Sequence, residues 1–198
     1  MMKAIVAVDE YYGIGKDGNL LFRISDDLKR FKKLTEGRAV IMGRRTLESL
    51  PGGKPLPDRI NFVLTQNKEY NQLGIIPIHS LDEMQEIFQT LRSDNIFVIG
   101  GASVYAQLLE YCDTVYMTKV YKHEIADAIF PDLPNDEWNP VSKSDRLTDE
   151  KTGLVFRYLV YERSPNFKDN WDFQLCKNRF FVDSSTGIPV SKKEDCVQ

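Results

Sequence analysis

A single carboxylate lies among apolar residues in the helical stretch from residue 25 to residue 35, which reads SDDLKRFKKLT. At about 100° per residue, Asp27 falls on the same arc as Leu28, Phe31 and Leu34. The other charged side chains of the stretch fall on the opposite arc. A carboxylate that faces the interior needs a partner or a purpose. Asp27 is therefore a candidate for a buried acid that pairs with a cationic or amidine-like ligand.

Asp27 also has a purely local interpretation. We expect Ser25 to cap the N-terminus of this helix, and Asp26 and Asp27 suit the positive end of the helix dipole. At that place a carboxylate can accept hydrogen bonds from the free amide groups of its own helix. The sequence alone leaves both roles open.

Three strand-to-helix junctions carry groups that suit phosphates. Each begins as an apolar run and ends in glycine, hydroxyl, amide or guanidinium groups, at residues 40–46, 62–66 and 97–105. Each signal is weak by itself, because Gly-Gly is common in tight turns and paired arginines are common on solvated surfaces. Ligands of open α/β sheets lie beyond the carboxyl ends of the strands, where free amide groups attract anions. Together the junctions predict a dinucleotide with an additional phosphate that arginine can bind.

The composition excludes several classes of protein. The 198 residues carry 26 Lys and Arg against 29 Asp and Glu, a net charge of -3, which argues against a nucleic-acid partner. No apolar run approaches the ~20 residues that span a bilayer, so we expect no membrane association. Three cysteines at wide spacing fit neither a disulfide framework nor a zinc site. We therefore expect no metal and a cytoplasmic location.

Alternating strands and helices are predicted to position these groups. The alternation indicates an α/β fold with a mostly parallel sheet, in which continuously apolar strands are buried on both faces. The last strand has no helix after it, so we expect an antiparallel edge there. The predicted strands cover residues 5–8, 39–42, 60–64, 75–78, 96–99, 114–121 and 154–161, and the predicted helices cover 26–35, 46–50, 81–91 and 103–110.

The C-terminal segment 163–198 differs from the rest of the chain. It keeps five aromatic residues, whereas a solvated tail is usually depleted in them. Two short apolar runs on either side of Ser-Ser-Thr-Gly predict a hairpin. We therefore divide the chain into a main domain, 1–162, and a C-terminal extension, 163–198. The extension is either partly ordered or docked on the body or on a partner.

Several ordered motifs within residues 1–162 resemble the dihydrofolate reductase family, in particular its bacterial members. The motifs are GIGKDGNL at 13–20, the Asp27 helix, IMGRRT at 41–46, PLPDR at 55–59, VIGGASVY at 98–105 and DAIFP at 127–131. The resemblance implies a mostly parallel mixed sheet flanked by helices. It also implies NADPH-dependent reduction of 7,8-dihydrofolate to tetrahydrofolate, by hydride transfer to pterin C6 with protonation at N5. A monomeric enzyme of one-carbon metabolism, and an antifolate target, is expected.

The resemblance also implies roles for single residues. Asp27 matches the acid that bonds the pterin 2-amino group and N3, and Thr118 matches a hydroxyl that bonds both. Arg59 matches the arginine that forks onto the α-carboxylate of the glutamate tail. The catalytic set is Asp27, Phe22 and Thr118, and the substrate-binding set is Ile5, Leu28, Phe31, Leu50, Arg59, Ile99 and Tyr105. The NADPH-binding set is Ala7, Ile14, Leu20, Gly43, Arg44, Arg45, Thr46, Thr65, Gln66, Gly100, Gly101, Ala102, Ser103 and Val104.

Four positions depart from the family pattern. Leu21 and Phe22 stand where the family usually has Pro-Trp, and phenylalanine keeps the apolar body of the tryptophan but loses its N–H donor. Ser103 stands where arginine is common, and Ala128 stands where threonine is common. Residues 11–23 match the mobile active-site loop, whose glycines leave it free to bend.

Two alternative functions remain open on the sequence. One is a reductase of the same fold that acts on another pterin or on a pyrimidine. The other is a weakly catalytic nucleotide-binding module whose extension serves a partner. Asp27 together with Arg59 favours a folate with its glutamate.

Overall fold

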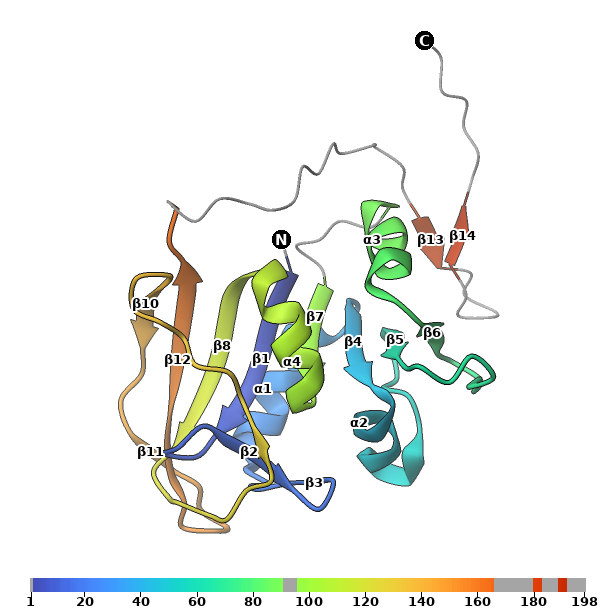
Figure 1. Ribbon diagram of the computed structural model, residues 1–198. Coiled ribbons are helices and arrows are strands. Elements are labelled where there is room, and N and C mark those ends of the chain that lie inside the picture. The colour runs from blue at the N-terminus through green and yellow to red at the C-terminus, as the bar shows by residue number, and fades with distance from the viewer. Residues whose placement is uncertain (1, 91–95, 166–179, 183–188, 192–198) are drawn as a thin grey trace.

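A mixed sheet of nine strands forms the centre of the computed structural model, which describes residues 2–90, 96–165, 180–182 and 189–191 (Figure 1). Its strands are β1 (Met2–Val8), β4 (Ala39–Gly43), β5 (Ile60–Leu64), β6 (Ile76–Ile78), β7 (Ile96–Gly100), β8 (Cys112–Val120), β10 (Trp138–Lys143), β11 (Leu147–Thr148) and β12 (Val155–Arg163). Eight of them lie in the order β10-β12-β8-β1-β7-β4-β5-β6, and β11 pairs with β12. Every strand predicted from the sequence has a counterpart here.

The middle of this sheet is parallel and its edge is antiparallel, as predicted. β1 pairs in parallel with β7 and β8, and β4 pairs in parallel with β5 and β7. β12 pairs antiparallel with both β8 and β10. Val40, Ile41 and Met42 in β4 are fully buried, because helices cover both faces of a parallel sheet.

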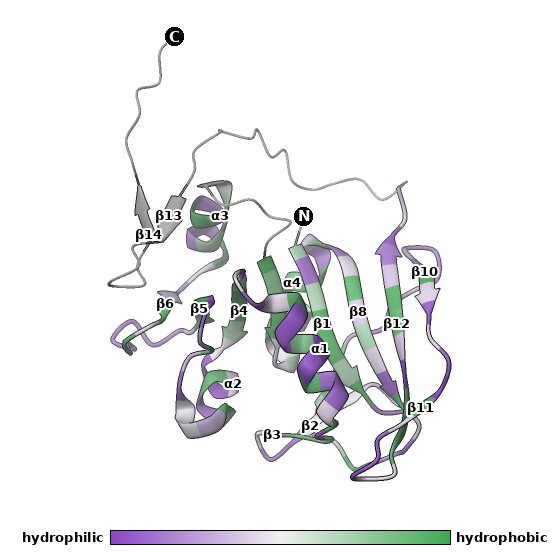
Figure 2. Ribbon diagram, turned by 180° about the vertical axis from the view of Figure 1, so that it is seen from behind, coloured by the Kyte–Doolittle hydropathy of each residue, from purple (hydrophilic) through white to green (hydrophobic). Residues whose placement is uncertain are grey.

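Helices lie on both faces of the sheet. They are α1 (Ser25–Thr35), α2 (Arg44–Ser49), α3 (Leu81–Thr90) and α4 (Ala102–Leu108), with short 3-10 turns η1 (Pro51–Gly53) and η3 (Leu109–Tyr111). α4 lies in front of the sheet in Figure 1, and α1 lies in front in the reverse view of Figure 2. The two helices therefore cover opposite faces. The last residue of the predicted helix 81–91 lies outside the described residues.

The predicted cap of α1 is wrong. Ser25 is the first helical residue, Ile24 occupies the N-cap position, and no side chain of the helix start caps it. The backbone N–H of Ser25 instead donates to Oδ1 of Asp149 at 3.3 Å. The Asp149 carboxylate, which is distant in the sequence, therefore accepts a hydrogen bond at the helix start, where the sequence predicted a cap by the Ser25 hydroxyl. No pattern within the helix indicates this partner.

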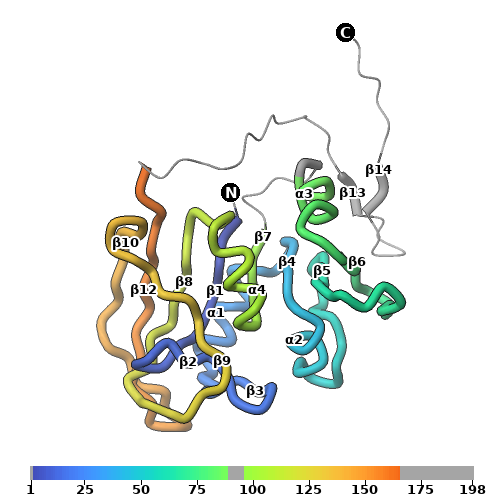
Figure 3. Tube along the Cα trace, viewed as in Figure 1, coloured from blue at the N-terminus to red at the C-terminus, as the bar shows by residue number. Residues whose placement is uncertain are grey.

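A small second sheet lies beyond the C-terminal end of β1 (Figure 3). It consists of β2 (Gly13–Lys16), β3 (Asn19–Leu20) and β9 (Ala128–Ile129), with β2 paired antiparallel to both others. This region was matched to the active-site loop on the sequence, and no strand was predicted in it. Its glycines have the spacing G-x-G-x-x-G, but they lie within the β2–β3 hairpin rather than in a turn between a strand and a helix, so the segment is no Rossmann turn.

Two further strands lie in the C-terminal extension. β13 (Phe180–Val182) and β14 (Pro189–Ser191) pair antiparallel in a separate two-stranded sheet. This pairing agrees with the hairpin expected in that segment. The other residues of the extension from residue 166 onward lie outside the described residues.

Candidate active site

Asp27 on α1 faces the sheet. The Thr118 hydroxyl on β8 donates to Oδ1 of Asp27 at 2.5 Å, and Thr118 is buried. Burial raises the pKa of the Asp27 carboxyl, while the Thr118 hydrogen bond and the positive charge of Arg30 act in the opposite direction. The carboxylate therefore reaches across to a strand. An inward acid with a shifted pKa suits recognition of a cationic or amidine-like group.

An apolar cluster lies beside Asp27. Its buried members include Ile5, and Phe31, Leu50 and Ile99 pack against it while partly exposed. Four of the seven residues predicted to bind substrate thus come together. Leu28 is the more open member of that set, with 48% of its surface exposed.

Two central strands are incompletely covered next to this cluster. Ala7 is only half-buried although Val6 and Val8 on either side are buried, and Ile99 contrasts with buried Val98 in the same way. Ala7 pairs with Thr118 across β1 and β8. The sheet face that carries Ala7 therefore stays accessible close to the Asp27 carboxylate.

Tyr105 occupies a different place from the other predicted substrate residues. Its side chain is buried, and its hydroxyl donates to the carbonyl oxygen of Ile5 at 2.6 Å. Burial raises the pKa of this phenol, so it remains a donor at neutral pH. Its ring packs edge-on against Phe130. The Tyr105 hydroxyl therefore links α4 to β1 through a hydrogen bond.

Arg59 is held at the C-terminal end of α1. Its Nε donates to the Thr35 hydroxyl at 2.9 Å, and its Nη1 donates to the carbonyl oxygen of Pro57 at 2.5 Å. Its guanidinium lies 5.9 Å from the centre of the Phe31 ring, and partial burial lowers its pKa. These contacts fix the plane of the guanidinium beside the apolar cluster, which a bidentate grip on a carboxylate requires.

The three strand ends predicted to hold phosphates meet at one edge of the sheet. They belong to β7, β4 and β5, which are neighbours in the sheet. A Cβ placed on Gly43 would lie 3.1 Å from Cγ2 of Val104, and one placed on Gly101 would lie 3.4 Å from the Thr46 hydroxyl. The β4–α2 and β7–α4 turns therefore approach each other closely, and glycine makes this approach possible.

Other residues predicted to bind NADPH surround this edge. Arg44 and Arg45 are exposed, and Arg44 forms a 3.6 Å ion pair with Glu48. The Thr65 hydroxyl accepts a hydrogen bond from the Asn67 amide at 3.2 Å. Gln66 and Ser103 are exposed, Gly100 is buried, and Ala102 is half-buried.

The active-site loop carries the remaining predicted residues. Ile14 is buried in β2, and its carbonyl oxygen accepts a hydrogen bond from the Leu21 amide at 3.4 Å. Leu20 is exposed. Phe22 packs against a small apolar cluster that contains Ile24 and Phe156. The phenylalanine therefore keeps an apolar contact, but it offers no donor.

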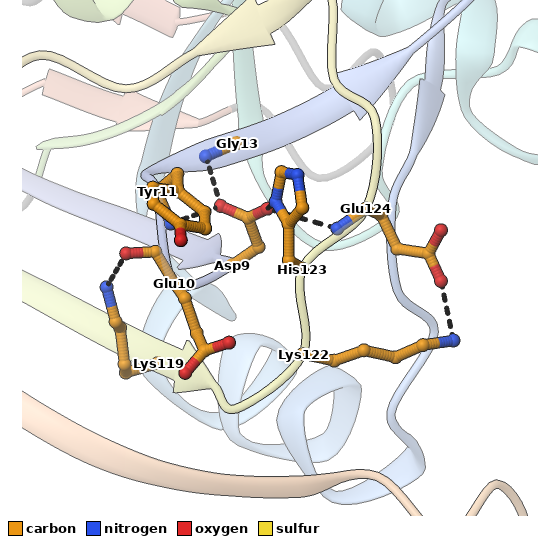
Figure 4. A network of polar contacts seen from close by, with 8 residues as sticks. All are labelled: Asp9, Glu10, Tyr11, Gly13, Lys119, Lys122, His123 and Glu124. Atoms are coloured by element: carbon orange, nitrogen blue, oxygen red, sulfur yellow. Dashed lines mark hydrogen bonds and ion pairs between the residues drawn. The ribbon is translucent and has the colours of Figure 1, made fainter.

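Asp9 is a buried residue that the sequence analysis missed (Figure 4). Its Oδ1 accepts from the amides of Tyr11 and Gly13, both at 2.7 Å. Its Oδ2 lies 3.2 Å from Nδ1 of His123 and accepts from the Glu124 amide at 3.3 Å. One carboxylate thus joins the start of the active-site loop to the segment after β8. An acid directly after a buried strand was the available signal.

Asp127 makes a second connection between the same segments. Its Oδ2 accepts from the Asp17 amide at 2.9 Å, and its own amide donates to the carbonyl oxygen of Gly15 at 3.1 Å. The β2–β3 hairpin is therefore held at its tip by Asp127 and at its base by Asp9.

Two other kinds of site are absent from the described residues. No three His, Cys, Asp or Glu side chains come together there as potential metal ligands. No helix in that part of the chain is long and apolar enough to cross a membrane. The polar groups described above include one inward carboxylate, one fixed guanidinium and the glycine-rich strand ends.

The fold and the site define a class: an α/β nucleotide-binding enzyme whose ligand site contains one inward acid. The dihydrofolate reductase family model matches residues 1–163. Dihydrofolate reductase of Bacillus subtilis is 37% identical over 168 residues, which are 85% of this chain and 98% of that protein. The enzyme of Staphylococcus haemolyticus is 35% identical over 80% of this chain and 93% of its own. The chain belongs to the dihydrofolate reductase family.

A solved structure agrees with this assignment. Dihydrofolate reductase from Enterococcus faecalis, complexed with NADP(H) and RAB-propyl, superposes with a TM-score of 0.75 at 34% sequence identity. The match covers 83% of this chain and 96% of that one. The expected fold class is thereby confirmed.

Proposed function

We propose that this member of the dihydrofolate reductase family reduces 7,8-dihydrofolate to 5,6,7,8-tetrahydrofolate with NADPH. The observation that carries the proposal is the Asp27 carboxylate bonded to Thr118 beside the half-buried Ala7 and Ile99. A pterin presents an amidine-like edge of one amino group and one ring nitrogen. A fixed carboxylate can accept two hydrogen bonds from such an edge and favours its positive charge.

The apolar cluster and Arg59 account for the rest of the substrate. Ile5, Phe31 and Leu50 offer an apolar surface for the aromatic part of the molecule, and Leu28 is open enough to be covered by it. Arg59 would bind the α-carboxylate of the glutamate, for which its planar fork is suited. A ligand held at both ends in this way keeps a single orientation, which raises the reaction rate.

The strand ends fit a dinucleotide with an additional phosphate. Gly43 and Gly101 bring two backbone turns together without a side chain between them, and α2 and α4 begin there with glycine caps that carry no side-chain hydrogen bond. Arg44 and Arg45 are exposed next to them and would bind the additional phosphate. Thr46, Thr65, Gln66, Gly100, Ala102, Ser103 and Val104 would complete this site.

The protein positions the reactants and controls charge. When bound, NADPH supplies the hydride. Asp27 would stay charged opposite the pterin and favour its protonated form, while solvent provides the proton for N5. Thr118 would hold Asp27 and share the pterin amino group. Ala7, Ile14 and Leu20 would border the reacting face, and Phe22 would exclude water from one side without holding a water itself.

A substrate panel separates this function from its alternatives. We expect NADPH oxidation, followed by absorbance, with dihydrofolate. A dihydropterin without the glutamate should show a KM raised at least about tenfold, the effect of losing one charge-assisted contact. Faster turnover of the glutamate-free pterin or of a pyrimidine would contradict the proposal, and tight NADPH binding without turnover would favour a binding module.

We propose that residues 1–162 with the end of β12 carry all of this chemistry in the cytoplasm as a monomer, and that the extension is accessory. Arg163 ends β12 and donates to the carbonyl oxygens of Cys112 and Leu109, both at 2.8 Å. The Ser164 amide donates to the carbonyl oxygen of Glu137 at 2.7 Å. A truncation after residue 165 keeps these bonds and should retain kcat within about twofold. Loss of turnover on truncation would assign the extension to the enzyme.

A further inference from the structure

Arg30 is the one basic residue of α1 that lies against the sheet near Asp27. Its guanidinium lies 4.3 Å from the centre of the Tyr158 ring on β12 and 5.6 Å from that of Tyr116 on β8. The sequence pattern had placed it on the solvent side of the helix. A guanidinium stacked on two tyrosines is instead a cation held against the protein.

The sheet register places this guanidinium next to the site of Asp27. Thr118, the donor to Asp27, pairs directly with Tyr158 across β8 and β12. Tyr116 precedes Thr118 by two residues on the same strand, so their side chains share a face. Asp27 and Arg30 are one helical turn apart, and such residues have Cβ atoms about 5–6 Å apart. The Asp27 carboxylate and the Arg30 guanidinium therefore lie over adjoining positions of one sheet patch, formed by Tyr116, Thr118 and Tyr158.

The guanidinium is poorly compensated by hydrogen bonds. Its Nη1 is buried and has no hydrogen-bond partner among the described residues, and burial lowers the pKa of Arg30. The titratable groups that face it are Asp27 on its own helix, Tyr116 on β8 and Tyr158 on β12. Asp26 is exposed and pairs with Lys29 at 2.8 Å. Asp27 is thus the buried anion available to balance this cation.

We propose that Arg30 is a positioning residue that keeps the Asp27 carboxylate ionised and ready to bind the pterin, an inference that rests on the proposed function. Burial alone favours the neutral acid, and a neutral Asp27 cannot match a protonated pterin. A cation at the adjoining position of the same patch opposes this preference, together with the Thr118 hydrogen bond, without occupying the ligand's place. Stacking on two rings holds that charge at a constant distance from the carboxylate.

The test is a carbon-13 NMR titration of the Asp27 carboxyl in the full chain without ligand, with the signal assigned by its loss in Asp27→Asn. Arg30→Met removes the charge, and Arg30→Gln is a second neutral variant if the first does not fold. Arg30→Lys keeps the charge. The control is Lys32→Met, because the Lys32 side chain is 64% exposed on the same helix.

Each neutral variant should raise the titration midpoint of Asp27 by about 1 unit or more, the usual effect of losing an opposite charge at this range. Arg30→Lys and Lys32→Met should leave it within about 0.3 unit, as expected for a retained or a solvent-screened charge. A midpoint that stays unchanged in folded Arg30→Met or Arg30→Gln would overturn the inference and leave Arg30 a packing residue.

A kinetic measurement connects the titration with the reaction. The low-pH fall of kcat/KM for dihydrofolate reports groups of the free enzyme, so it should move upward with the NMR midpoint in Arg30→Met. If the NMR midpoint moves but the pH at which kcat/KM falls does not, the role of Arg30 in the reaction is contradicted. If the wild-type chain did not turn over dihydrofolate, the proposed function would fail, whereas the NMR result would still decide the coupling of Arg30 with Asp27.

Discussion

Asp9→Asn tests whether a buried carboxylate at the base of the active-site loop stabilises the fold. The Asp9 side chain accepts two short hydrogen bonds through Oδ1 and two longer contacts through Oδ2 (Figure 4). An asparagine can keep its carbonyl oxygen toward Tyr11 and Gly13. Its amide nitrogen would then face the N–H of Glu124 and the ring of His123.

The expected loss follows from these contacts. A hydrogen bond to a charged acceptor contributes about 1.5–3 kcal/mol, and a buried donor left unpaired costs about 1–3 kcal/mol. The His123 side chain is 57% exposed and can turn to water, so the Glu124 amide dominates the loss. We expect Asp9→Asn to lower the free energy of unfolding by about 2–3 kcal/mol at neutral pH.

The stability that the Asp9 carboxylate contributes should depend on pH in a defined direction. Burial raises the pKa of Asp9, but the hydrogen bonds from Gly13, Tyr11, Glu124 and His123 together outweigh it and lower the pKa below its ordinary value. The carboxylate therefore stabilises the fold above the unfolded pKa of about 3.9, and this contribution disappears as the pH falls through the folded pKa. The difference between wild type and Asp9→Asn should shrink in acid.

Urea unfolding followed by the fluorescence of buried Trp138 and by circular dichroism measures this difference. Glu10→Gln is the matched control, because it removes an exposed carboxylate at the next residue and should change stability by less than about 0.5 kcal/mol. An Asp9→Asn protein within 0.5 kcal/mol of wild type, about the effect of an ordinary surface change, would refute the reasoning, as would a difference that grows in acid.

Two further substitutions test other parts of the account. Arg59→Lys loses the planar fork, so the KM for dihydrofolate should rise about 10- to 100-fold with kcat nearly unchanged in steady-state assays; an unchanged KM would remove Arg59 from the site. Gly100→Ala adds a Cβ at a φ of 103° and 2.8 Å from the Tyr105 ring, which should lower the free energy of unfolding by about 2–4 kcal/mol. Gly153 also has a positive φ, 71°, but a Cβ added there would meet no atom within 4 Å, so Gly153→Ala should lower the free energy of unfolding by only about 1 kcal/mol. Equal losses of stability for Gly100→Ala and Gly153→Ala in urea unfolding would contradict a steric cause.

The central sheet was predictable because its strands are locally encoded. Runs such as Ile96–Gly100 are continuously apolar and end in glycine. The apolar pattern and the glycine therefore both indicate a buried strand that ends there. β10 was missed because Trp138 is its one buried residue and Pro140 lies within it. β2, β3 and β9 are short, and pairing between distant segments stabilises them rather than any pattern within each.

The site was predictable where one helix face or one strand end carries the signal. Asp27 stood out because it interrupts an apolar arc. Asp9 and Arg30 could not be placed in the same way, since their roles depend on which strands lie opposite them. The Asp149 contact with the start of α1 shows the same limit, because its partner is 124 residues away.

The pH–rate profile of Asp27→Asn tests the central claim most directly. NADPH oxidation with dihydrofolate should fall by at least about 100-fold at neutral pH, the usual contribution of a positioned ionisable group. Binding of NADPH alone, followed by fluorescence, should be nearly unchanged, because the edge proposed to bind its phosphates lies on β4, β5 and β7. A variant with the wild-type rate and an unchanged pH–rate profile would contradict the assignment of Asp27 as the acid of this site.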